Sequence, residues 1–176
     1  GDIATGMRSW LNSFYHRLPL INPGLRAVGM GCVVVRDGPG SNSLADCQTH
    51  SSRMSAEIVY PFSGAVDVPV NFGGESPDPL PSGAGAVGPP ITVTLAGGMR
   101  PKNVTAVIEN VKTGEKSTEF YLSTPDAPAN KTYPDNEGTI CAIPKKMLDA
   151  GVTYRVTITA KVGGDNKTWT TEFTTR

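Results

Sequence analysis

The sequence predicts a mostly β protein, in which a β-sandwich follows a short α/β segment with one amphipathic helix. The 20 Gly and 15 Pro residues are dispersed rather than periodic, which indicates many turns. Beyond about residue 55, six or seven short β-prone segments follow one another with turn signals between them. Helical periodicity is confined to residues 2–19. A hydrophobic content of 38% is enough for a packed core.

Residues 2–19 predict the helix, because apolar residues recur every three or four positions. These residues are Ile3, Met7, Trp10, Leu11, Phe14 and Leu18. Pro19 and then Pro23 are expected to end the helix. An isolated helix of this length is marginal in water, so its apolar face needs a partner surface. That surface is the sandwich, a second copy of the chain in a homo-oligomer, or an N-terminal half that this chain lacks.

After the helix, residues 27–37 predict a strand, and residues 38–54 predict a loop from their Gly, Ser and Asn content. We place the boundary near Tyr60, with a partial α/β segment at 1–58 and the sandwich at 59–176. The predicted strands of the sandwich are residues 91–96, 104–111, 119–124, 138–144, 153–162 and 169–176. Tyr154 begins the longest of them, in a position that suits a tyrosine corner.

Residues 2 to about 55 resemble the closing helix and following strand of bacterial CAP (SCP-like) domains. The shared positions are Trp10, Ser13, His16, Arg17, Leu20, Asn22, Pro23 and residues 28–31. In that family a cavity is completed by an upstream helix with another His and by a Gly-Glu-Asn segment. This chain contains neither. The resemblance therefore implies either the C-terminal portion of a longer protein or a lost site.

Residues 59–176 are similar to the bacterial Ig-like modules of extracellular proteins. The shared frame comprises Pro61, Gly64, Ala65, residues 67–69, Leu148, Gly151, Tyr154, Val156, Phe173 and Thr174. Such a frame defines a scaffold and not an activity. Together the two resemblances imply an extracellular or cell-surface location in a bacterium.

His16 is the candidate catalytic residue, with Ser13 and Asn12 on nearby helix faces. Ser9, Asn12 and His16 share the polar face, which could line a cavity or simply face solvent. A catalytic His needs a positioned partner, and the sequence identifies none. We therefore expect His16 to do no chemistry in this chain. For Arg17 we expect a structural role, with a buried stem and a guanidinium bonded to carbonyls or a carboxylate.

No cofactor is predicted. Glu75 and Asp78, in a Pro-rich loop, are weak candidates for binding Ca²⁺, and the alternative is a rigid crossing at one end of the sandwich. Cys32 and Cys47 flank a loop-rich stretch, so they either form a disulfide or remain small buried side chains. Cys141 lies in an apolar run and is expected to be a buried free thiol.

The 16 basic and 16 acidic residues cancel, which disfavours a nucleic-acid partner. No apolar run approaches the roughly 18 residues of a membrane span. The expected partner is a protein, a cell-wall component or a small-molecule ligand. The sequence thus favours a non-catalytic binding or structural module. The alternative is a CAP-type ligand carrier or hydrolase whose cavity needs a further N-terminal half.

Overall fold

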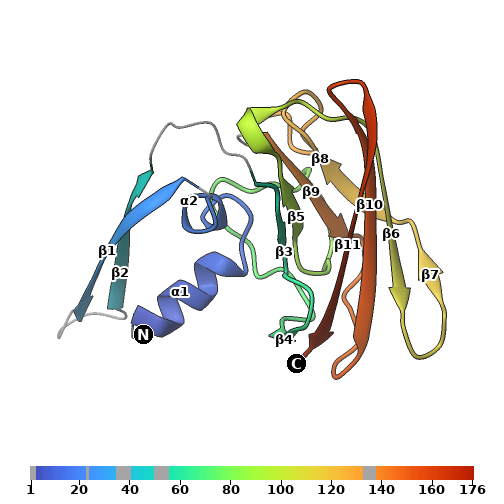
Figure 1. Cartoon of the computed structure of the whole chain (residues 1–176). Helices are drawn as coiled ribbons and strands as arrows, with labels where there is room; N and C mark the ends of the chain where they lie inside the picture. Colours follow the sequence, from blue (N-terminus) through green and yellow to red (C-terminus); the bar gives the residue numbers. More distant parts are fainter. Residues whose placement is uncertain (1–2, 23, 35–40, 50–55, 133–137) are drawn as a thin grey trace.

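The computed structural model describes residues 3–22, 24–34, 41–49, 56–132 and 138–176, with the backbone alone for 32–34 and 41–49. The protein is mostly β and consists of a β-sandwich with an α/β segment beside it (Figure 1). In this view the hairpin of that segment lies at the left and the sandwich at the right, with the two helices between them.

The α/β segment contains helices α1 (Ile3–Leu11) and α2 (Arg17–Leu20) and strands β1 (Leu25–Val34) and β2 (Ser41–Thr49). β1 and β2 form a two-stranded antiparallel sheet. The prediction of a strand after the helix is confirmed. The prediction of a loop over residues 38–54 is wrong for 41–49, because these polar residues pair along the whole of β1 and gain their strand structure from that partner.

Two sheets pack face to face to form the sandwich. One has the strand order β4-β11-β10-β6-β7, and the other has the order β3-β5-β9-β8. Pairing within both sheets is antiparallel, except that β4 runs parallel to β11. The strands are β3 (Ile58–Tyr60), β4 (Ala65–Val68), β5 (Ile91–Thr94), β6 (Lys102–Asn110), β7 (Lys116–Ser117), β8 (Phe120–Ser123), β9 (Thr139–Pro144), β10 (Thr153–Val162) and β11 (Asp165–Thr175). β5, β6, β8, β9, β10 and β11 lie where the sequence predicts strands, so the sandwich prediction is confirmed. The short strands β3, β4 and β7 were not among the predicted strands.

The core between the sheets reflects the alternation along β10. Val156, Ile158 and Ala160 are buried, and the residues between them are only half-buried. This period of two places every second side chain against the opposite sheet. The buried side chains of β5 and β9 complete the core from the other side, among them Ile91, Val93, Ile140 and Ala142.

β9 is buried on both faces along its whole length, which explains its unbroken apolar run. Ile140 and Ala142 face the sandwich core. Cys141 and Ile143 belong to a second cluster on the outer face of the same sheet, which we call the outer cluster. This second cluster also contains Phe14, Leu18, Phe72, Leu80 and Val87. The sandwich is therefore the partner surface that the helical segment needs, because Phe14 is 0% and Leu18 is 6% exposed.

The prediction of a single helix over residues 2–19 is wrong in one respect, because the helix is interrupted between Leu11 and Arg17. The backbone N–H of Ser13 bonds to the Trp10 carbonyl, and its hydroxyl donates to the same oxygen at 2.7 Å. The backbone N–H groups of residues 14–16 donate to the carboxylate of Glu75, in the sandwich, instead of to carbonyls of a continuing helix. Pro19 lies inside α2 rather than at its end, in the first turn where a missing N–H costs nothing.

Candidate functional site

The carboxylate of Glu75 joins the sandwich to the break between the two helices. The Phe14 N–H donates to Oε1 at 2.6 Å, and the Tyr15 N–H lies 3.1 and 3.0 Å from the two oxygens. The His16 N–H donates to Oε2 at 3.3 Å. The Glu75 side chain is only 3% exposed, so these bonds replace the water that the charge would otherwise need. Glu75 thus binds three consecutive backbone groups, as an anion does in a backbone nest.

His16 is bonded to the same carboxylate. Its Nδ1 lies 2.8 Å from Oε2 of Glu75, and the hydrogen must be on Nδ1 because a carboxylate only accepts. The His16 side chain remains 43% exposed. The sequence suggested no partner for His16, because Glu75 lies 59 residues further along the chain. No local pattern signals this pair, although the Gly-Gly-Glu stretch at 73–75 marks a loop with room for close approach.

Arg17, next to His16, is 1% exposed and lies against the sandwich. Its Nε donates to the Leu11 carbonyl at 2.7 Å, and one terminal nitrogen donates to the Pro90 carbonyl at 2.9 Å. The guanidinium also covers the Tyr60 ring, 4.4 Å from its centre. Burial lowers the pKa of Arg17 to about 10, so it remains a cation at neutral pH. The prediction of a structural role for Arg17 is confirmed.

Burial also shifts the pKa values of two groups near the contact between Glu75 and the 14–16 turn, which we call the Glu75 anchor. It raises the pKa of the Tyr15 phenol to about 12, with the negative charge of Glu75 adding to the effect. It raises the pKa of the Cys141 thiol as well. Cys141 is 1% exposed and is a free thiol, as predicted. Both groups are therefore neutral at physiological pH.

Ser13 and Asn12, the other catalytic candidates, do not join His16. The Ser13 hydroxyl is engaged with the Trp10 carbonyl. Ser13 and Asn12 instead line a cavity of about 410 Å³ between α1 and residues 69–74 of the sandwich, which we call the seam cavity. Its lining residues are Thr5, Arg8, Ser9, Asn12, Ser13, Pro69, Asn71, Phe72, Gly73, Gly74 and Arg176. His16 is not among the lining residues of the seam cavity.

The two candidates for calcium binding have separate partners. The carboxylate of Glu75 holds the 14–16 turn, and Oδ1 of Asp78 accepts the Leu80 N–H at 2.9 Å. No three His, Cys, Asp or Glu side chains gather as a metal site within the described ranges. The arrangement of Asp78 is an Asx turn, which stiffens the Pro-rich loop.

The side chains of Cys32 and Cys47 lie outside the described residues, so their disulfide stays a prediction. The backbone register of the β1–β2 hairpin pairs Cys47 with Val28 and Cys32 with Ser43. The two cysteines are therefore not cross-strand partners in this register.

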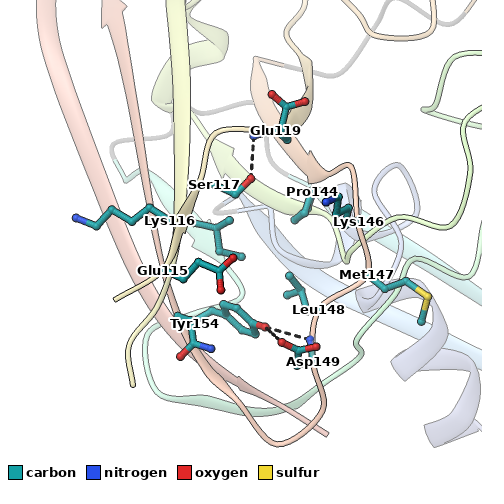
Figure 2. A pocket seen from close by; sticks show the side chains of 12 residues that line it. Glu115, Lys116, Ser117, Glu119, Pro144, Lys146, Met147, Leu148, Asp149 and Tyr154 are labelled. Carbon is teal, nitrogen blue, oxygen red and sulfur yellow. Dashed lines mark hydrogen bonds between the residues drawn. The ribbon is translucent and has the colours of Figure 1, made fainter. Parts of the chain in front are cut away.

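A second cavity of about 380 Å³, which we call the corner cavity, lies between the β6–β7 hairpin and the segment that connects β9 to β10 (Figure 2). The Tyr154 hydroxyl accepts the Asp149 N–H at 3.0 Å and donates to the Asp149 carboxylate at 3.3 Å. This bond to the backbone five residues upstream is the geometry of a tyrosine corner, as predicted. Acidic and basic side chains both line this cavity, including Glu115 and Lys146, so the lining carries charges of both signs.

No protein-family model and no curated protein matches this sequence. Of the helices that the structure describes, none is long and apolar enough to cross a membrane. The class that the fold and the site define is therefore a β-sandwich with an α/β segment fastened to its outer face by Glu75 and Arg17.

Proposed function

We propose that this chain is a non-catalytic module of a secreted or cell-surface bacterial protein that binds cell-wall material. The observation that carries the proposal is the Glu75 anchor. A buried carboxylate that accepts three backbone N–H groups and an imidazole fixes the α/β segment on the sandwich. In this proposal His16 and Arg17, the His-Arg pair of the CAP-like motif, attach the α/β segment to the sandwich, and the sandwich is the scaffold that holds it.

The chemistry around His16 supports a structural role over catalysis. A general base must reach the proton that it removes, and it is usually held by a carboxylate that is dedicated to orienting it. Here Glu75 binds the backbone of the same turn, and the nearby Ser13 hydroxyl donates to a carbonyl. The seam cavity, where a ligand could be enclosed, has no contribution from His16.

The test is co-sedimentation of the chain with purified bacterial cell walls, comparing the original chain with His16→Ala. We expect both proteins to sediment with the walls equally, and neither to release soluble fragments from them. Loss of sedimentation for the original chain would contradict the binding role. Release of fragments by the original chain and not by His16→Ala would contradict the non-catalytic role.

The second candidate is a CAP-type hydrolase or ligand carrier that uses His16. The observation that favours it is the 2.8 Å bond from His16 Nδ1 to Glu75, together with the 43% exposure of the ring, which leaves it accessible. This candidate predicts ester or amide hydrolysis that is lost in both His16→Ala and Glu75→Gln. Equal, background-level rates in all three proteins would exclude it.

A further inference from the structure

We infer that the seam cavity binds an acidic sugar, through the guanidinium groups of Arg8 and Arg176. This inference rests on the proposed function and names the class of ligand that the module would take from a cell wall. It draws on the charges that line the cavity, the polar groups between them and the space available.

The charged side chains of the lining are all basic. Arg8 comes from α1 and Arg176 follows β11, so the two cations reach the cavity from the two parts of the molecule. No Asp or Glu side chain lines it. Within the described part of the chain, neither arginine forms an ion pair. Two arginines without an ion pair in the lining of one cavity favour an anion, and planar guanidinium groups suit a carboxylate or a phosphate.

The nearest acidic residue along the chain does not compensate this charge. Glu75 directly follows Gly74 of the lining, but both of its carboxylate oxygens are bonded to the 14–16 turn. The Glu75 carboxylate is therefore directed to the 14–16 turn and does not line the seam cavity.

The remaining polar groups suit a hydroxyl-bearing ligand. Ser9 and Asn12 lie on the helical side of the cavity, and Asn71 lies on the side of the sandwich. Hydroxyl and amide groups both donate and accept, as sugar hydroxyls do. Gly74, at φ +85°, has nothing within 4 Å of the position that a Cβ would take, so a ligand can approach the backbone there.

The size of the seam cavity suits a small ligand. Its volume of about 410 Å³ lies toward the lower end of the range for small-molecule pockets, which is roughly 300–1,000 Å³. One acidic monosaccharide unit, free or within a longer chain, fits this description. The corner cavity of Figure 2 is of similar size, but its lining mixes both charges and so selects neither.

The experiment is an NMR titration of the ¹⁵N-labelled chain with glucuronate, glucose 6-phosphate and glucose. We expect the two anions to shift the amide signals of Asn12, Gly73 and Gly74, and neutral glucose to leave them in place. A larger response to glucuronate than to glucose 6-phosphate would assign a carboxylate ligand, and the reverse would assign a phosphate. Equal responses to glucose and glucuronate, or no response to any of the three, would overturn the inference.

The variants Arg8→Gln and Arg176→Gln should each weaken glucuronate binding about tenfold, because each loses charge-assisted hydrogen bonds. The matched control is Lys112→Gln, which removes an exposed positive charge on the far hairpin and should leave the affinity unchanged. Equal weakening in all three variants would indicate a general charge effect and contradict the site. Cell-wall sedimentation that persists in the two arginine variants would reject the seam cavity and leave the proposed function standing. Glucuronate binding without sedimentation would reject the function and leave the site.

Discussion

The carboxylate of Glu75 and the imidazole of His16 are 2.8 Å apart, although 59 residues separate them in the chain. The same carboxylate accepts the N–H groups of Phe14, Tyr15 and His16. Glu75 therefore orients a whole turn of backbone and not one ring alone. This contact ends α1, places Phe14 in the outer cluster and aligns Arg17 with the carbonyls of the sandwich.

Glu75→Gln should lower the free energy of unfolding by about 2–3 kcal/mol. The amide loses the charge that strengthens these hydrogen bonds, and its NH₂ group would face backbone donors. Urea unfolding measures the change. Hydrogen exchange should show residues 12–20 losing protection while β9 and β10 keep theirs.

The matched control for that variant is Glu119→Gln. Glu119 is 64% exposed and pairs with Lys145 at 3.1 Å on the surface, so its loss should cost less than about 1 kcal/mol. If the two variants were equally stable, the Glu75 anchor would be no stronger than a surface ion pair.

Arg17→Met should destabilise the chain by about 2–4 kcal/mol. Methionine keeps an apolar stem of similar length, but the carbonyls of Leu11 and Pro90 lose their donors in a buried site. Thermal or urea unfolding gives the value, and Arg100→Met is the exposed comparison. A variant as stable as the original chain would show that the cost of burying the cation outweighs its hydrogen bonds.

Alkaline pH should destabilise the protein in a window set by Tyr15. Its pKa is 10.0 as a free group and about 12 in the fold, because burial disfavours the phenolate. The folded state therefore holds a proton on Tyr15 that the unfolded chain releases, so this group lowers the free energy of unfolding as the pH rises from 10 to 12. Urea unfolding across this range should show a shallower fall for Tyr15→Phe. Parallel slopes for the two proteins would contradict this assignment.

Cys141 should resist alkylation in the folded protein and react fully in denaturant. It is 1% exposed, and burial raises its pKa, so little thiolate is available to react. Labelling with iodoacetamide followed by peptide mass analysis measures this. The same map tests the Cys32–Cys47 disulfide, which would appear as one linked peptide pair. Rapid labelling of Cys141 without denaturant would show that the outer cluster opens easily.

The sandwich and most of its strands are predictable from local patterns in the sequence. The alternation along 153–162 predicts β10 because a period of two is a local property of the chain. The corner at Tyr154 was also predictable, since its partner Asp149 lies only five residues upstream. These features need only neighbouring residues to define them.

The position of the interruption between the two helices and the contact of His16 with Glu75 depend on long-range packing. The apolar period runs unbroken through residue 18, and the break arises because Glu75 takes N–H groups that a helix would otherwise use. The seam cavity likewise brings Arg8 and Arg176 together from opposite ends of the chain. Such contacts depend on how distant segments pack, and no periodicity within either segment records them.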